Sequence, residues 1–428
     1  MPSLKETLRY LFSLESLGIK PGLFRIEKLL DLLGNPQNSY PSILVGGTNG
    51  KGSTASMIAS VLREAGLKKV ALYTSPHLSE FNERITVDGS EITGREITCL
   101  TSKIKALLGR NLKPSFFELT TAMAFEYFRE KKVDLAVIEV GMGGRWDATN
   151  VVTPLVSVIT GVSLDHTRYL GNTIRDIAFE KAGIIKYKGR VVTGATLPPS
   201  LNVIKEEARK KKASLYILGR DFRIAGEEDS FSYYGGGKPL KRLCLNLKGR
   251  HQTRNAACAL KTIDILQDYG YGIKKEAVRK GLKKAAWPGR FEIVRKNPAV
   301  ILDCAHNPEG ALVLKEALRR VPFKKLIFVI GVMEDKDIEG IFSALLAPAD
   351  TVIFTEPSCK RRAGVEMLLE RLGNYAGKVI VKRKIREALK EAFKEASGKD
   401  CICVTGSIFT VGEARRYLYE KSRNPEKS

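Results

Sequence analysis

Short runs of β-branched and other apolar residues alternate along the chain with longer segments of mixed apolar and polar residues. The short runs predict buried strands at Ser42–Val45, Val70–Tyr73, Leu135–Val140, Val156–Thr160 and Arg190–Thr193. The longer segments predict helices at Thr54–Ala65, Phe117–Lys131 and Asp176–Lys181. Strands that alternate with helices indicate an α/β fold whose mainly parallel sheet is covered on both faces.

The pattern is interrupted at the segment AAWPGR, residues 285–290, and then begins again. The second series predicts a helix at Gly310–Arg320 and strands at Ala299–Asp303, Leu326–Gly331, Thr351–Phe354, Val379–Val381 and Cys401–Thr405. We therefore place a boundary near residue 292. Residues 1–292 are expected to form a P-loop-type nucleotide-binding domain, and residues 293–428 a smaller Rossmann-like α/β domain. The polar segment 221–247 predicts a hairpin insertion.

Composition narrows the class of protein. The apolar stretches are far shorter than the ~20 residues of a membrane helix, and charges at Lys5, Glu6, Arg9 and Glu15 interrupt any signal-peptide core. Seven cysteines without a zinc or disulfide spacing favour a reducing compartment. We expect a soluble, cytoplasmic protein. The net charge of +24 permits nucleic acid or polyanionic small substrates, but the basic residues are scattered and not interleaved with aromatic residues.

The strongest chemical signal is ILVGGTNGKGS, residues 43–53, in which an apolar strand runs into a glycine-rich turn and then a helix. Glycines let backbone N–H groups point at phosphate oxygens, Lys51 reaches the outer phosphates, and the helix N-terminus adds partial positive charge. The spacing departs from G-x-x-x-x-G-K-[ST], because three residues separate Gly46 from Gly50 and Gly52 stands between Lys51 and Ser53. The segment predicts a mononucleotide phosphate site.

Polar residues follow two further predicted strands. Glu139 lies near the end of the run Leu135–Val140, and the glycine-rich polar segment 141–150 comes after it. The next strand leads into TGVSLDH, residues 160–166, which ends at His166, one of four histidines. Ligands of open α/β sheets bind at the carboxyl ends of the strands, and Mg²⁺ prefers oxygen ligands. These residues are therefore candidates for the same nucleotide and metal site.

Nine motifs in order carry a family resemblance from about Leu11 to Arg416. They are GGTNGKGS, YTSPHL, SFFELTTAMAF, VIEVGMGGRWDATN, SLDHTRYLG, FEKAGIIK, WPGRFE, DCAHNPEG and VTGSIFTVGE. Together they resemble folylpolyglutamate synthase/dihydrofolate synthase, the folate branch of the Mur ligase superfamily. The resemblance implies an ATP-dependent, ADP-forming ligase that adds L-glutamate to dihydropteroate or a reduced folate through an acyl phosphate. The oligomeric state is open, with a monomer as the default, and we expect neither nucleic acid nor a membrane as a partner.

The resemblance also implies a role for individual residues. Those expected to hold ATP are Thr48, Asn49, Gly50, Lys51, Gly52, Ser53, Asn255, Arg290 and Asp303. Two Mg²⁺ sites are implied, the first at Ser75 and Glu139 and the second at His166. Lys181 corresponds to a lysine that the family carries as a carbamate, and His306 is expected near the transferring phosphate. The residues with catalytic roles are then Lys51, Lys181, Asp303 and His306.

The resemblance also implies that three segments bind the acceptor acid. Their residues are Ser16, Leu17, Gly18, Phe117, Glu118, Trp146, Asp147 and Ala148, and Ser407 is expected to face the incoming glutamate. Family members often carry leucine where this chain has Trp146, so the substrate fit at that position is open. Whether the enzyme uses dihydropteroate, folates or both is also open, and the Leu14–Gly18 segment favours both.

Three alternatives remain. A peptidoglycan Mur ligase performs the same type of reaction, but it usually carries an extra N-terminal domain for which the residues before Gly46 leave no room. A P-loop NTPase that acts on nucleic acid would explain the basic charge. A non-catalytic nucleotide-binding module is disfavoured by the polar residues at several strand ends.

Overall fold

The computed structural model describes residues 2–18, 22–109 and 112–423. The chain divides into two compact units. The first contains residues 1–77, 81–246 and 252–286, and the second contains residues 78–80, 247–251 and 287–428.

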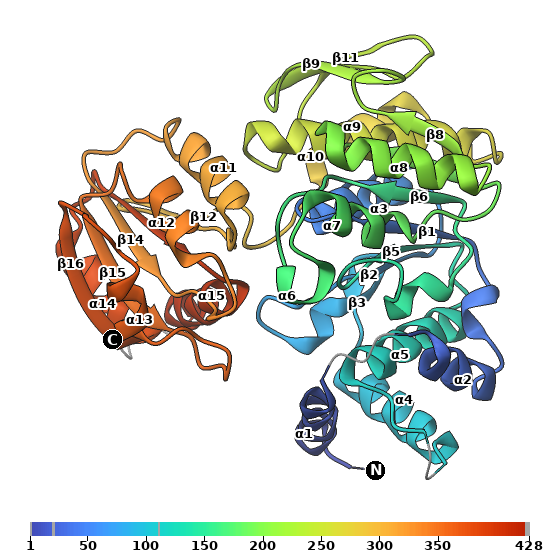
Figure 1. The fold of residues 1–428 in the computed structure, drawn as a ribbon, viewed down its shortest axis with the longest axis horizontal. Helices are drawn as coiled ribbons and strands as arrows, with labels where there is room; N and C mark the ends of the chain where they lie inside the picture. The colour runs from blue at the N-terminus through green and yellow to red at the C-terminus, as the bar shows by residue number, and fades with distance from the viewer. Residues whose placement is uncertain (1, 19–21, 110–111, 424–428) are drawn as a thin grey trace. The chain divides into compact units, whose positions relative to one another are not determined.

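The first unit is built on an eight-stranded sheet with the order β4-β3-β2-β5-β1-β6-β7-β8 (Figure 1). Its strands are β1 (Ser42–Gly46), β2 (Val70–Tyr73), β3 (Ile85–Val87), β4 (Ser90–Glu91), β5 (Leu135–Glu139), β6 (Val156–Ile159), β7 (Arg190–Thr193) and β8 (Ser214–Ile217). The strands from β2 to β8 in this order are parallel, and β3 and β4 join one edge as antiparallel strands. Because β1 and β5 are buried at every residue, helices must cover both faces of the sheet.

Helices follow most of these strands. They are α1 (Leu4–Ser13), α2 (Phe24–Leu32), α3 (Lys51–Glu64), α4 (Gly94–Leu107), α5 (Phe116–Lys131), α6 (Thr167–Leu170), α7 (Ile174–Ala182), α8 (Pro198–Lys210), α9 (Arg250–Gln267) and α10 (Lys275–Lys284). Short 3₁₀ turns are η1 (Leu14–Leu17), η2 (Pro36–Asn38), η3 (Phe81–Arg84) and η4 (Ala148–Val151).

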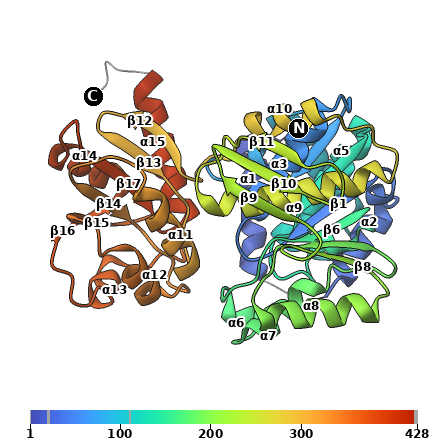
Figure 2. The same cartoon turned by 90° about the horizontal axis from the view of Figure 1, so that it is seen from above.

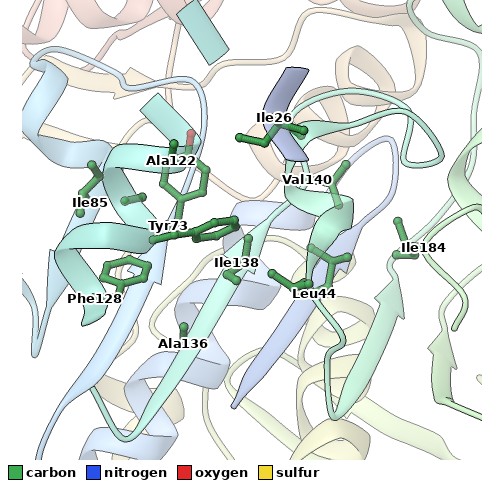
Figure 3. Packing of buried hydrophobic residues seen from close by; sticks show 14 of the residues in the cluster. Ile26, Leu44, Tyr73, Ile85, Ala122, Phe128, Ala136, Ile138, Val140 and Ile184 are labelled. Carbon is green, nitrogen blue, oxygen red and sulfur yellow. The ribbon is translucent and has the colours of Figure 1, made fainter. Parts of the chain in front are cut away.

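One large core cluster fills the face of the sheet that carries Leu44, Tyr73 and Ile138. Figure 3 shows Ile138 of β5 between Tyr73 of β2 and Leu44 of β1, as the strand order requires. Helices α1, α2, α4, α5, α7 and α8 contribute apolar residues to this cluster. Elsewhere α3 packs closely on α10, where a Cβ on Gly281 would lie 2.5 Å from the Val61 Cα.

The insertion is a small antiparallel sheet with the order β11-β10-β9. Its strands are β9 (Arg223–Glu227), β10 (Ser230–Tyr234) and β11 (Leu240–Leu243). The hairpin predicted for residues 221–247 is confirmed, with one strand more than a hairpin has.

The second unit contains a six-stranded sheet with the order β12-β13-β17-β14-β15-β16, in which only β12 is antiparallel to its neighbour. The strands are β12 (Glu292–Lys296), β13 (Ala299–Leu302), β14 (Leu326–Ile330), β15 (Thr351–Glu356), β16 (Lys378–Lys384) and β17 (Cys401–Thr405). The helices are α11 (Pro308–Leu318), α12 (Ile338–Leu345), α13 (Val365–Glu370), α14 (Ile385–Glu395) and α15 (Ile408–Arg423).

Alternate residues of these strands enter two separate cores. Phe328 and Ile330 of β14 pack with residues of α11, α12 and α13, whereas Ile327 and Val329 pack with residues of α14 and α15. Figure 2 shows the two groups of helices on opposite sides of the sheet. This arrangement follows from the two-residue period of a strand.

The predicted α/β fold with a mainly parallel sheet is confirmed, and every predicted strand is present, with each end at most three residues from its predicted position. The start of the helix predicted at Thr54 was wrong. Helix α3 begins at Lys51, because Gly50 takes a left-handed conformation and ends the turn there. In the described part of the chain, no helix is both long and apolar enough to cross a membrane.

Candidate active site

The glycine-rich loop between β1 and α3 has the backbone geometry of a phosphate site. Gly47 and Gly50 have positive φ angles of 138° and 83°, which glycine adopts at little cost. A Cβ on Gly47 would lie 2.0 Å from the Thr160 Oγ1, and one on Gly50 would lie 2.3 Å from the Asn255 Oδ1. Only glycine fits at these two positions, so the backbone N–H groups stay accessible at the start of α3.

Hydrogen bonds fix this loop to the segment that follows β6. The Thr48 N–H donates to the Gly161 oxygen at 2.9 Å. The Ser163 N–H donates to the Thr48 Oγ1 at 3.1 Å, and the Thr160 Oγ1 donates to the Asn49 oxygen at 2.6 Å. Thr160 was not predicted as a site residue, although its position at the end of a predicted strand was a usable signal. The loop is therefore held in shape by the protein alone.

Two lysines converge on one carbonyl oxygen of the loop. The Lys51 Nζ donates to the Gly47 oxygen at 3.1 Å and to the Thr48 oxygen at 2.9 Å. The Lys181 Nζ, from the last turn of α7, donates to the same Gly47 oxygen at 2.9 Å. Lys181 is only 4% exposed. Burial, together with the charge of Lys51, lowers the pKa of Lys181 to about 7, so the neutral amine is well populated at neutral pH.

The structure brings the predicted metal ligands Ser75 and Glu139 together. Glu139 is the last residue of β5, and Ser75 lies just beyond the neighbouring strand β2. The Ser75 N–H donates to the Glu139 Oε2 at 3.2 Å, and Glu139 is 5% exposed. The Ser75 Oγ is buried without a hydrogen-bond partner among the described residues, whereas buried hydroxyls are nearly always bonded. The pair therefore offers two oxygen donors of the kind that Mg²⁺ takes.

His166 lies after β6, in the turn that precedes α6. Its φ is 51°, an uncommon value for a residue other than glycine, and its N–H donates to the Asp165 Oδ1 at 2.9 Å. Among the residues that the structure describes, no three or more His, Cys, Asp or Glu side chains form a group that could hold a metal. The assignment of His166 to a second metal therefore stays a prediction.

The remaining residues predicted for the nucleotide in this unit lie close to the loop. Gly52 and Ser53 are buried in the first turn of α3. Asn255, on α9, packs against Gly50, and its Nδ2 donates to the Gln252 Oε1 at 3.0 Å. The structure thus brings the Asn255 amide to the phosphate loop; its predicted contact with adenine is not tested.

The segment 141–150 is a rigid loop around one buried carboxylate. Asp147 accepts hydrogen bonds from the Met142 N–H at 2.9 Å and the Thr149 N–H at 3.0 Å, and burial raises the pKa of this carboxyl. The Phe117 ring reaches the same place, because a Cβ on Gly141 would touch both the Phe117 Cζ and the Asp147 Oδ2. Ala148 is buried beside Asp147.

Trp146 has the opposite character, with 54% of its surface exposed. Its neighbour Arg145 is fixed, because the guanidinium lies 3.8 Å from the centre of the Phe179 ring and bonds Glu207 at 3.0 Å. The loop therefore presents an exposed indole on an anchored backbone.

The positions of the other predicted acceptor residues do not indicate a contact with the acceptor. Glu118 completes a capping box with Ser115 at the start of α5 and forms an ion pair with Arg25 at 3.1 Å, so the structure gives it a structural role. Gly18 follows η1 with a φ of 66°. The side chains of Ser16 and Leu17 lie outside the described part of the chain.

In the second unit, predicted residues cluster at the end of β13. Asp303 accepts hydrogen bonds from the Phe291 N–H at 2.8 Å and the Ala305 N–H at 2.9 Å. Burial raises the pKa of Asp303, and the nearby Arg290 opposes this shift. The His306 Nδ1 lies 2.9 Å from the Cys304 oxygen, to which it donates in the neutral Nδ1–H tautomer.

Ser407 lies at the start of α15, just beyond the neighbouring strand β17, and the N–H of Gly406 before it donates to the Ala305 oxygen at 3.1 Å. The Ser407 Oγ accepts a hydrogen bond from the Thr410 N–H at 3.0 Å, as a helix-capping serine does. A role toward glutamate stays a prediction.

Comparisons with known proteins identify the family. The model of the Mur ligase middle domain matches residues 45–263, and that of the Mur ligase glutamate ligase domain matches residues 289–408. The dihydrofolate synthase/folylpolyglutamate synthase of Bacillus subtilis is 38% identical over 418 residues, which cover 94% of this chain and 96% of that protein. The chain belongs to the folylpolyglutamate synthase/dihydrofolate synthase branch of the Mur ligase family.

Solved structures of the family agree with this assignment. The folylpolyglutamate synthase of Thermotoga maritima is 39% identical, with a TM-score of 0.84 over 97% of this chain and 96% of that one. The FolC protein of Escherichia coli, solved with DHPP and ADP, is 32% identical, with a TM-score of 0.90 over 99% of this chain and 100% of that one. The similarity to these synthases extends over both units, which favours the folate branch over a peptidoglycan ligase or a nucleic-acid NTPase.

Proposed function

We propose that this protein is an ATP-dependent ligase that joins L-glutamate to the carboxylate of a pteroate- or folate-type acid and releases ADP and phosphate. One observation carries the proposal: Lys51 and Lys181 converge on the Gly47 carbonyl of a phosphate loop, in a chain that is similar over nearly its whole length to named folate synthases. The similarity in sequence and the placement of the two lysines at the loop support the proposal independently of each other.

The nucleotide residues are those of the loop and its surroundings. Thr48, Asn49, Gly50, Lys51, Gly52 and Ser53 would bind the phosphates, and Asn255, Arg290 and Asp303 would bind the rest of ATP. The hydrogen bonds that hold the phosphate loop in shape support this role, because a site already shaped before binding needs no reorganisation when phosphate charge develops. Lys51 is the loop's charged group, and its Nζ would exchange two carbonyl partners for phosphate oxygens.

The residues also fit a divalent cation. Mg²⁺ is usually bound by one or two protein oxygens together with phosphates and waters, and the buried Ser75 Oγ without a bonding partner matches this donor set beside Glu139. When bound, the metal neutralises phosphate charge and polarises the phosphorus that is attacked. A second Mg²⁺ near His166 is part of the proposal and rests on the family resemblance.

We propose that Lys181 is carried as a carbamate. Its neutral amine would add to the carbon of CO₂, forming an N–C bond and losing one proton to solvent. The full burial of Lys181 and its pKa of about 7 support this step, since only the neutral amine has a lone pair. The product turns a cation beside the loop into an anion with two oxygens, which suits a second metal ion.

The reaction then needs positioning more than covalent participation by the protein. An acceptor carboxylate oxygen attacks the γ-phosphorus and ADP leaves. The glutamate nitrogen next attacks the acyl carbon, the bond from this carbon to the phosphate oxygen breaks, and the amine loses its proton. Lys51 would balance the charge of the phosphates, and His306 would lie near the transferring phosphate. Asp303 would contact the nucleotide from the end of β13, where the Phe291 N–H fixes its carboxylate.

On the acceptor side, the proposal assigns Phe117, Asp147 and Ala148 to the pterin, because the structure groups them around one buried loop. Glu118, Trp146 and residues 16–18 complete the expected contacts, and Ser407 would face the glutamate. We further propose that both dihydropteroate and tetrahydrofolate are accepted, as the names of the bifunctional relatives suggest. The proposal also includes separate roles for residues 1–292 and 293–428, a monomeric state and the absence of nucleic acid as a partner. It includes a cytoplasmic location as well, which the seven free thiols favour.

The test is ADP release from the purified protein with dihydropteroate and tetrahydrofolate supplied separately, each with and without L-glutamate. Turnover is expected only when acceptor and glutamate are both present. Lys51→Ala serves as the inactive control and should lower turnover at least ~100-fold, because it removes a charge that faces the transferring phosphate. Equal ATP hydrolysis with and without the two substrates would exclude the ligase.

A further inference from the structure

Arg84 is a buried cation at the carboxyl edge of the first sheet that the proposed function does not use. It ends η3, and its carbonyl oxygen accepts a hydrogen bond from the Thr74 N–H at 2.9 Å. Thr74 directly precedes Ser75, which bonds Glu139. Arg84 therefore sits beside the proposed metal pair, with only 5% of its surface exposed.

The guanidinium of Arg84 has an incomplete set of partners. Its Nε donates to the His77 Nδ1 at 2.8 Å, and the group lies 5.1 Å from the centre of the Phe116 ring and 5.9 Å from that of Phe81. Within the described residues, no carboxylate oxygen lies within 4.0 Å of it. Burial lowers the pKa of Arg84; Tyr73 opposes this shift most, and the carboxylates of Glu15, Glu139 and Glu83 oppose it at longer range.

Other arginines of this unit show what is missing. Arg25 pairs with Glu118 at 3.1 Å, Arg129 with Glu126 at 2.5 Å, and Arg145 with Glu207 at 3.0 Å. Each of the three is more exposed than Arg84. Taking a charge out of water is costly unless a partner of opposite charge is close, and a guanidinium has five donors arranged to match a carboxylate. The least exposed of these four arginines is the one that lacks this partner.

A cluster of aromatic rings adjoins the Arg84 guanidinium; Phe81 and Phe116 are buried in it, and Phe12 and His77 are its partly exposed members. Phe12 stacks on Phe116 with ring centres 5.5 Å apart and planes 17° apart, and it is partly exposed. His77 lies 6.2 Å from Phe12 and 6.3 Å from Phe81, ring centre to ring centre. A buried cation beside stacked rings is complementary to an aromatic acid, which can place its ring on the rings and its carboxylate on the guanidinium.

We propose that Arg84 binds a carboxylate of the acceptor acid. The proposal rests on the proposed function and adds a specific residue to it. The carboxylate can come from two sources with the same chemistry: the carboxylate that is activated, which pteroate and folate share in kind, or the α-carboxylate of a glutamyl residue, which only folate carries. Either one supplies the anion that the guanidinium lacks.

The first experiment compares two ligands that differ only in the carboxylate. Binding of dihydropteroate and of its carboxamide is measured by calorimetry on the full-length wild type, Arg84→Met, Arg84→Lys and Arg129→Met. The wild type should bind the acid ~10- to 100-fold more tightly than the amide, as expected for hydrogen bonds to a charged group. If Arg84 binds the carboxylate that is activated, Arg84→Met should bind both equally, and Arg84→Lys should keep part of the preference. Arg129→Met loses a structural ion pair and should keep all of it.

The second experiment identifies the source of the carboxylate. A rise in the KM of Arg84→Met for both dihydropteroate and tetrahydrofolate assigns the carboxylate that is activated, and a rise for tetrahydrofolate alone assigns the α-carboxylate. A folded Arg84→Met that keeps both the full preference of the wild type for acid over amide and the wild-type KM for tetrahydrofolate overturns the proposal. If Arg84→Met does not fold, an unchanged preference together with an unchanged KM for tetrahydrofolate in Arg84→Lys does the same, because lysine cannot reproduce the two-pronged contact. Wild-type protein that turns over neither acceptor contradicts the proposed function and not the Arg84 assignment alone.

Discussion

Replacing Lys181 with methionine is expected to stabilise the protein while it removes activity. The wild-type side chain is almost completely buried, and its pKa falls from the ordinary 10.5 to about 7. Below pH 7 the folded protein must therefore carry a charge in a poorly solvated place. Methionine has a similar shape and no charge, and the Gly47 oxygen keeps Lys51 as a donor.

The sign and size of the effect follow from proton linkage. Between about pH 7 and about pH 10.5 the unfolded chain binds one proton more at this lysine than the folded chain does. The free energy of unfolding of the wild type therefore rises with pH by about 1.4 kcal/mol per unit in this window. Over the whole window the gain is on the order of 4–5 kcal/mol. The advantage of Lys181→Met should be constant below pH 7 and shrink by this slope above it.

Urea denaturation in CO₂-free buffer at about pH 6, 7.5 and 9 measures this difference directly. Lys186→Met is a matched control, because burial is the main cause that lowers the pKa of Lys186 to about 8. The stability advantage of Lys186→Met over the wild type should therefore begin to shrink about one pH unit higher than that of Lys181→Met. A stability difference between Lys181→Met and the wild type that is the same at pH 6 and at pH 9 would show that folding does not lower the pKa of Lys181.

Two further substitutions test the loop and the metal pair. Gly50→Ala should weaken ADP binding in calorimetry, because its Cβ collides with Asn255. Gly66→Ala has a similar φ of 88° and open space around it, so it pays only the backbone cost of about 1 kcal/mol and should bind ADP normally; equal losses in both variants would contradict the clash. Glu139→Gln should raise the Mg²⁺ concentration needed for half-maximal turnover at least ~10-fold, and chelation with EDTA should stop the wild type. An unchanged metal titration would remove Glu139 from the site.

The fold was predictable where a strand is buried on both faces. The run Leu135–Val140 is apolar until Glu139, and the strand was predicted to within one residue. Strands β3, β4, β8 and β12, which lie at or next to the sheet edges, were missed, because they are short or half-exposed and their hydrogen-bond partners come from tertiary structure. The helix start at Lys51 was missed because Gly52 lies inside the first turn, where propensity argues against a helix.

The site was predictable as far as it depends on sheet topology. Ser75 and Glu139 follow neighbouring parallel strands, so their meeting at one edge follows from the predicted fold. Glu118 carried a signal that was not used, since Ser115 three residues before it forms the S-x-x-E pattern of a capping box. The proposed role of Arg84 could not be predicted from the sequence. It depends on the lack of a carboxylate near the guanidinium among the described residues, which only the folded structure shows.

Lysines on the outer strand β16 of the second unit contribute to the chain's high positive charge, and they have a role that involves no ligand. This strand closes one edge of its sheet, and Val379 and Val381 are exposed on it. Lys378 and Lys382 flank the segment Val379–Val381 and form ion pairs with Glu395 and Glu391 of α14. Lysines along an open strand keep a second molecule from adding its own strand there. That protection is electrostatic, so it fades when the Debye length falls to about 3 Å near 1 M salt. Concentrated salt should therefore favour edge-to-edge self-association, and low ionic strength should keep the molecules apart.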